Sequence, residues 1–171
     1  LMKRKGKGSY TKQQILWIVL RFSMGWIFLW AFLDKLFGLG FATAKESSWL
    51  AGNSPTMGFL THATKGPFVT LFQALAGNPV VDWLFMMGLL LVGVALILGI
   101  GVRIAGYVGA LMLLLIYLAG FIPPEHNPFM DEHLLQMFIL IGLTLVKSGH
   151  WFGYGEIWSK TKLVKKYPIL E

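Results

Sequence analysis

Three proton-active residues stand side by side in the stretch HNPFMDEHLLQMF, which covers residues 126–138. They are Asp131, Glu132 and His133, and an apolar segment follows them directly. Imidazole takes up and releases protons near neutral pH, and a neighbouring carboxylate can orient the ring and stabilise its charge. The cluster therefore has the residue types needed for proton transfer, and His133 is the centre of that hypothesis.

The first apolar segment carries a second set of polar residues. Arg21 and Lys35 are fourteen positions apart, close to four helical turns, so one face of a helix is expected to carry both. Arg21 either extends toward lipid phosphates or faces the protein interior, where it would hold an anionic or carbonyl-bearing ligand. Asp34 points elsewhere around the helix, and we expect it to approach His133 as a carboxylate–imidazole pair.

Simpler interpretations exist for most of these residues. Acidic side chains in the first turn of a helix are stabilised by the helix dipole by about 0.3–1 kcal/mol, which accounts for Asp131 and Glu132 without any ligand. Asn127 followed by Pro128 has the form of a helix cap and a first helical residue. In the same way, Asp34 and Lys35 can form a pair that marks the end of a span.

Two further ligand classes are considered for the polar residues. Trp30 follows Trp26 by one helical turn, which suits either packing or the stacking of a ligand on the indole ring. A metal site is weakly supported, because Pro128 separates His126 from the cluster and no spacing fixes a ligand geometry. We therefore expect no metal, and the four histidines offer no evident axial pair for haem.

The composition shows what kind of protein must position these residues. Of its 171 residues, 56% are hydrophobic and 13% are charged, against roughly 25% charged residues in a soluble domain. The mean hydropathy is +0.64, so a membrane protein is predicted. The absence of cysteine excludes Cys-ligated iron–sulfur clusters and c-type haem in this chain. Electrons would therefore need an organic carrier or a partner subunit.

Four apolar segments predict an all-α bundle of four membrane-spanning helices in a single domain. Their approximate bounds are 15–37, 81–102, 104–122 and 128–147. The uninterrupted apolar part of the last segment is shorter than the about 20 residues that a spanning helix needs. That helix must therefore include its first turns, which places the cluster of acids and histidine at the edge of the bilayer.

Two other segments complete the predicted architecture. A long connection, about residues 38–80, is expected to fold over the outer ends of the helices as a cap. It contains Phe68, Leu71, Phe72 and Leu75 at helical spacing, which predicts a short amphipathic helix. Residues 151–171 form a basic tail in which a surface helix over 156–168 is predicted.

The distribution of charge predicts the orientation in the membrane. With both termini inside, the inner face carries eleven basic and two acidic residues, a net charge of +9, and the outer face has a net charge of −3. The inner basic residues are Lys3, Arg4, Lys5, Lys7, Lys12, Arg103, Lys147, Lys160, Lys162, Lys165 and Lys166. With Arg21 inside the first span, these charges sum to the overall +7, so topology explains the basic balance and we expect no nucleic-acid partner.

Several stretches together resemble the DoxX/DoxD family. They are LRFSMGWIFLWAFLDKLFG, SWLAGNSPTMGFL with the following GPF, GLLLVGVALILGIGVRIAG and NPFMDEHLLQMFILIGL, in this order, and the resemblance covers about residues 15–155. It implies a small four-span protein of a prokaryotic cell membrane. Within it, Arg21, Asp34, Lys35 and the Asp131–Glu132–His133 cluster are the family-type polar positions.

The DoxD-like branch is associated with thiosulfate:quinone oxidoreductase. The resemblance therefore implies an oxidoreductase subunit that passes electrons from a sulfur compound such as thiosulfate to membrane quinone, together with a DoxA-like partner. We expect a quinone head group near the outer ends of the first and fourth spans, with His133, Asp131, Glu132 and Asp34 handling protons. Lys35, Arg21 and Trp30 are the expected ligand-binding residues. The alternative is a non-catalytic accessory or assembly subunit of a larger membrane complex.

Overall fold

The structure is a computed structural model that describes residues 9–171, and it contains helices and no strands within that range. Three helices are long and apolar enough to cross a membrane: α1 (Lys12–Phe37), α3 (Pro79–Leu98) and α4 (Val102–Gly120). The expected all-helical fold is thus confirmed, with three helices that could span a membrane. The basic residues Lys3, Arg4, Lys5 and Lys7, used above to predict orientation, lie outside the described residues.

Local capping signals set the ends of the two longest helices. Thr11 caps α1 in a capping box with Gln14, and Gly38 ends this helix in the left-handed conformation with φ 66°. The side chain of Asn78 caps α3 and Pro79 follows in its first turn. These caps satisfy backbone groups that a helix end in a membrane protein would otherwise leave without partners.

The fourth apolar helix, α5 (Glu132–Leu145), begins later than the sequence analysis predicts. The expected cap at Asn127 and Pro128 is wrong, because the side chain of Asn127 accepts hydrogen bonds from Phe129 N and Met130 N and closes a turn instead. Asp131 is the cap, with its Oδ1 3.0 Å from Leu134 N. With 14 residues, α5 is about 21 Å long, shorter than the about 30 Å of a hydrocarbon core.

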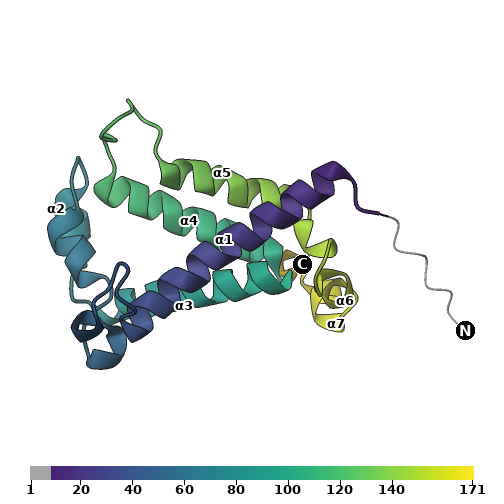
Figure 1. The fold of residues 1–171 in the computed structure, drawn as a ribbon, viewed down its shortest axis with the longest axis horizontal. Coiled ribbons are helices and arrows are strands. Elements are labelled where there is room, and N and C mark those ends of the chain that lie inside the picture. Colours follow the sequence, from purple (N-terminus) through teal and green to yellow (C-terminus); the bar gives the residue numbers. More distant parts are fainter. Residues whose placement is uncertain (1–8) are drawn as a thin grey trace, which may run out of the picture.

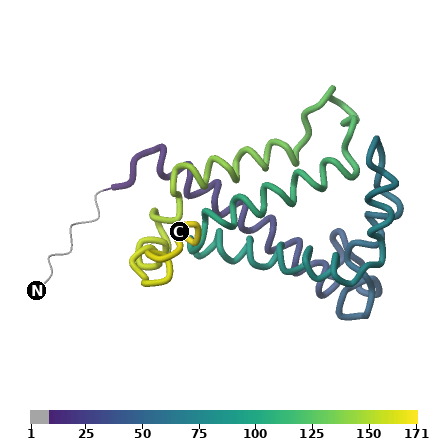
Figure 2. The backbone as a smooth tube through the Cα atoms, turned by 180° about the vertical axis from the view of Figure 1, so that it is seen from behind, coloured from purple at the N-terminus to yellow at the C-terminus, as the bar shows by residue number. Residues whose placement is uncertain are grey.

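The helices form a bundle with two different ends (Figure 1). Helices α3 and α4 meet at the turn 99–101 and diverge toward α2 (Val69–Gln73), while α5 runs beside α4. Helix α1 crosses the bundle obliquely and contacts both α3 and α5. Figure 2 shows the same arrangement from behind, with residues 38–78 at one end and 146–171 at the other. We call these the cap end and the tail end.

Glycines let the helices approach each other closely. A Cβ atom on Gly93 of α3 would lie 2.7 Å from Leu29 N of α1, and one on Gly106 of α4 would lie 2.0 Å from Thr144 Oγ1 of α5. Small residues at such positions give close van der Waals contact between helices in lipid. The buried core between the helices consists mainly of Met24, Phe28, Met86, Val92, Leu96, Leu113, Leu140 and Leu143.

Two buried carboxylates attach the cap segment to the bundle. Asp34, near the end of α1, accepts hydrogen bonds from Phe41 N at 3.2 Å and Ala42 N at 2.9 Å. Asp82, in the first turn of α3, accepts from the hydroxyls of Ser54 at 2.8 Å and Thr56 at 2.6 Å. Both carboxylates therefore bind the loop rather than another helix.

The cap itself is built from short helical turns: η1 (Lys45–Ser47), η2 (Trp49–Ala51), the π-helix η3 (Phe59–Ala63) and α2. The predicted amphipathic helix is reduced to the five residues of α2, and residues 74–77 follow it as turns that end at Gly77 with φ 74°. Lys65 N donates to Ala119 O at 3.0 Å, so the cap also contacts the end of α4.

The tail is likewise more segmented than predicted. It comprises η4 (Ser148–His150), α6 (Gly155–Ser159), α7 (Lys162–Lys166) and η5 (Pro168–Leu170). The single surface helix expected over 156–168 is interrupted, because the side chain of Thr161 accepts from Val164 N and starts a new helix.

Arg21 joins α1 to the beginning of the tail. Its side chain is fully buried, with 0% exposure, and it donates from Nη1 to Ser148 O at 2.6 Å and Trp151 O at 2.9 Å. Its Nη2 donates to Phe152 O. Three backbone carbonyls thus replace the carboxylate that usually accompanies a buried guanidinium. Arg21 therefore faces the protein and does not extend to lipid.

We predict that Arg21→Lys destabilises the protein, since an ammonium group cannot donate in the planar fork that reaches all three carbonyls. The expected loss is about 2–5 kcal/mol in the free energy of unfolding. It is measured by denaturant unfolding in detergent, followed by tryptophan fluorescence. Arg103→Lys, at an exposed arginine, is the control and should change stability by less than about 0.5 kcal/mol. Equal effects of the two substitutions would contradict the assignment.

Candidate functional site

The cap end contains a large apolar cavity of about 670 Å³. It lies between α1, α3, α4 and the start of α5, and residues of the cap cover it. This volume falls within the about 300–1,000 Å³ of pockets that bind small molecules. Its apolar wall includes Ile27, Phe28, Phe59, Leu60, Phe72, Phe85, Leu89, Met112, Leu113, Ile116 and Phe121. The cavity is suited to a ligand that is mainly apolar.

A small group of polar side chains interrupts this apolar wall. Lys35 comes from α1, and Glu132, His133 and Gln136 come from the first turns of α5. Within residues 9–171, neither Lys35 nor Glu132 forms an ion pair. The cavity therefore offers a free cation, a free carboxylate, an amide and an imidazole to a polar head group.

The imidazole of His133 is held in a defined orientation by Asp131. The Nδ1 atom lies 2.6 Å from Asp131 Oδ2, and both side chains are largely buried. Because an ionised carboxylate only accepts hydrogen bonds, the ring donates from Nδ1 and leaves Nε2 for a ligand. The other oxygen of Asp131 caps α5 at Leu134 N. One carboxylate thus starts the helix and orients the histidine.

Aromatic packing fixes the plane of the same ring. The ring centroids of His133 and Phe121 are 4.3 Å apart with an interplanar angle of 36°, and Phe121 also stacks on Phe59 of η3 at 6.5 Å. Gly120 permits this approach, because a Cβ atom there would lie 2.9 Å from Ala63 O. The cap, the end of α4 and the start of α5 therefore position the imidazole together.

The structure brings together four of the seven predicted site residues: Lys35, Glu132 and His133 line the cavity, and Asp131 supports His133. The other three lie elsewhere. Asp34 binds the amides of the cap segment, so the expected Asp34–His133 pair is wrong.

Arg21 and Trp30 do not line the cavity either. Arg21 binds the tail carbonyls at the opposite end of the bundle. Trp30 contacts Trp26 at 5.5 Å and Phe41 at 5.0 Å between ring centroids. Both residues therefore have partners within the chain that account for them.

Some contributors to the site do not emerge from the sequence analysis. Gln136 follows Glu132 and His133 by one helical turn, a spacing that places it on the same face of α5. Phe59 and Phe121 are ordinary aromatic residues in the sequence, and only the folded cap brings them beside His133. Helical spacing is thus a usable signal for Gln136, whereas the aromatic contacts depend on tertiary structure.

The cavity borders the apolar exterior where α3 and α4 diverge. Gly88 and Met112 are in close contact, since a Cβ atom on Gly88 would lie 2.5 Å from Met112 Sδ. Leu84 and Leu115 lie closer to the cap end than this contact, and both line the cavity. The side chain of Leu84 is 70% exposed and that of Leu115 is 45% exposed. At these two leucines, the wall of the cavity is therefore exposed on the side of the bundle.

Comparisons of the chain with protein-family models, curated proteins and solved structures found no match. The chemistry of the cavity and its position in the bundle are consequently the basis for a functional proposal.

We predict that Asp82→Ala loosens the cap, because the hydroxyls of Ser54 and Thr56 lose their buried acceptor. The expected cost is about 1–3 kcal/mol, concentrated in the cap segment. Hydrogen–deuterium exchange checks it: amides of residues 53–63 should exchange at least tenfold faster, while those of α4 and α5 keep their protection. Glu46→Ala, at an exposed acid of the same segment, is the control. Unchanged exchange in the Asp82 variant would contradict this role.

Proposed function

We propose that the protein is a DoxX/DoxD-like membrane subunit of a quinone-linked redox system and that the cap-end cavity binds the quinone. The observation that carries the proposal is the combination in one apolar cavity of Lys35, Glu132 and a His133 oriented by Asp131. A membrane quinone has a small head group with two carbonyl oxygens and a long apolar tail. The cavity supplies hydrogen-bond partners for the first and apolar surface for the second.

The polar side chains have distinct parts in this proposal. The ammonium group of Lys35 donates a hydrogen bond to a carbonyl oxygen and stabilises negative charge that develops there. His133 Nε2 gives a proton to an oxygen of the ring, and Asp131 stabilises the protonated imidazole that precedes this step. Glu132 connects the cavity to the aqueous edge of the membrane and resupplies His133 with protons.

The electrons come from outside this chain. Reduction of a quinone to a quinol takes up two electrons and two protons, and two thiosulfate ions that join through a sulfur–sulfur bond release two electrons. We assign the oxidation of the sulfur compound to a DoxA-like partner subunit, in line with the family resemblance. This chain then binds the quinone and delivers its protons.

The proposed topology has four spans, with the tail end in the cytoplasm and the cap end outside. Basic residues at the tail end support it: Arg103, Lys147, Lys160, Lys162, Lys165 and Lys166. In this topology, helix α5 spans the hydrocarbon region only together with the segments at its two ends. We therefore propose that the His133–Asp131 pair lies near the outer interface. A thinner local bilayer or contact with a partner subunit would complete this span.

We predict that His133→Ala lowers quinone reduction by about 100-fold or more, since it removes the proton donor. The measurement is thiosulfate-dependent quinone reduction in membranes that contain the partner subunits, together with the quinone content of the purified protein. His126→Ala, at an exposed histidine of the preceding loop, is the control and should leave both unchanged. Wild-type protein without bound quinone, and with turnover unaffected by His133→Ala, would support the accessory-subunit alternative.

We further predict that quinone enters from the lipid between α3 and α4. Leu84→Trp should narrow this opening and weaken the binding of a long-tailed quinone by about tenfold, while a short-tailed analogue that enters from water keeps its affinity. Leu91→Trp, at a residue of α3 that is 63% exposed and does not line the cavity, is the matched control. Affinities come from titrations of quinone-depleted protein in nanodiscs. Parallel weakening of both quinones would argue against lateral access.

A further inference from the structure

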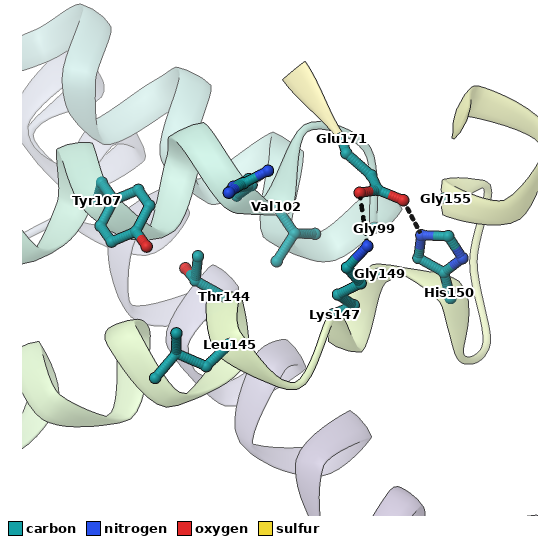
Figure 3. A pocket seen from close by; sticks show the side chains of 11 residues that line it. Gly99, Val102, Tyr107, Thr144, Leu145, Lys147, Gly149, His150, Gly155 and Glu171 are labelled. Carbon is teal, nitrogen blue, oxygen red and sulfur yellow. Dashed lines mark hydrogen bonds and ion pairs between the residues drawn. The ribbon is translucent and has the colours of Figure 1, made fainter. Parts of the chain in front are cut away.

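A second, smaller pocket lies at the tail end, opposite the cap-end cavity. Figure 3 shows the side chains that line it. It has a volume of about 240 Å³ and is formed by the start of α4, the end of α5 and the tail. This is less than the about 300 Å³ of pockets that enclose a whole small molecule, so it suits a single charged group. Nothing in the proposed quinone chemistry uses it.

Three cationic or protonatable side chains line this pocket, and each comes from a different part of the fold. Arg103 belongs to the first turn of α4, Lys147 follows the end of α5, and His150 belongs to η4. Lys147 has a φ of 52°, which is uncommon for a residue with a side chain. The fold thus brings positive charge together in this pocket, although the backbone of Lys147 adopts an unfavourable conformation.

An acidic side chain of the protein, that of Glu171, occupies part of this pocket. The carboxylate of Glu171 lies between two of the basic groups, with Oε2 3.0 Å from Lys147 Nζ and Oε1 2.9 Å from His150 Nε2. Its backbone carbonyl accepts from Arg103 N at 2.9 Å. The hydrogen bond from Lys147 holds the pKa of Glu171 below its ordinary value, so this side chain is ionised at neutral pH. The pocket therefore already functions as an anion-binding site.

The guanidinium of Arg103 is the least used group of the pocket. Within residues 9–171 it makes one long contact, 3.5 Å from Nη1 to Pro168 O, and no ion pair. Arg103 lines the pocket together with Tyr107 and Thr144. A guanidinium next to an ammonium group and a histidine matches the geometry and charge of a phosphate better than those of a single carboxylate.

We propose that the tail-end pocket binds a phosphate group, which competes with the Glu171 carboxylate for Lys147 and adds Arg103 as a partner. Two sources have this chemistry: the head group of an anionic phospholipid and free phosphate. Binding would release the segment around Glu171, because Glu171 holds this segment to α4, to η4 and to Lys147. The proposal is independent of the quinone site.

The experiment uses the full chain in nanodiscs of phosphatidylcholine, with or without phosphatidylglycerol, and native mass spectrometry to count retained lipids. We expect wild-type protein to retain phosphatidylglycerol selectively and Glu171→Gln to retain it roughly threefold to tenfold more strongly. Lys147→Gln and Arg103→Gln should abolish the selectivity. Glu156→Gln and Lys160→Gln are matched controls, because this exposed pair lies in the same tail outside the pocket.

A parallel arm identifies the source of the phosphate. Inorganic phosphate is added to protein in pure phosphatidylcholine nanodiscs, and thermal unfolding is compared with that in an equal concentration of chloride. Stabilisation by phosphate that is stronger in Glu171→Gln and absent in Arg103→Gln assigns the site to free phosphate, whereas selectivity only for phosphatidylglycerol assigns it to lipid. Equal behaviour of the Glu171 and Glu156 variants in both arms would overturn the proposal.

Discussion

The fold depends on a buried charge that has no counter-charge within residues 9–171. The guanidinium of Arg21 is fully buried and binds three backbone carbonyls of residues 148–152. These carbonyls can converge on it only because the chain turns sharply there and because Gly99 leaves room, since a Cβ atom on Gly99 would lie 3.0 Å from Arg21 Nη1. Removing such a group from water is unfavourable unless hydrogen bonds compensate, and here Nη1 and Nη2 have carbonyl acceptors while Nε has none within residues 9–171. The hydrogen bonds of Arg21 therefore hold α1 against the turn between α3 and α4. They also hold the tail against α1 and this turn.

At the cap end the buried charges are negative, and the cap segment supplies the hydrogen-bond donors. There, buried carboxylates accept from the cap: Asp34 from backbone amides and Asp82 from hydroxyls. Both acids are occupied in this way, and within residues 9–171 Lys35 forms no ion pair and lines the cavity. The tail-end attachment also has a geometric consequence. Helices α3 and α4 are held together at the tail end, so their divergence at the cap end creates the volume that the cap then covers.

Hydropathy was sufficient to predict the three long helices, because twenty apolar residues in a row have few other stable environments. It could not predict the partners of the charged residues. The spacing of Arg21, Asp34 and Lys35 defines faces of one helix, but Asp34 turns to a loop whose path depends on tertiary contacts. The start of α5 was misplaced for a related reason: Asn127 and Asp131 are both good caps, and Asn127 is used by its own local turn. His133 was correctly placed at a helix start, although its partner is Asp131 rather than Asp34.

Asp131 shows why structural and functional explanations of one residue need not exclude each other. Its Oδ1 caps α5 and its Oδ2 binds the imidazole of His133 two residues later. A cap must have its carboxylate fixed relative to the first turn, and that same rigidity determines which nitrogen of His133 carries the proton. Asparagine would preserve the cap but present an uncharged amide to the ring, so the charge needed to stabilise a protonated imidazole would be lost.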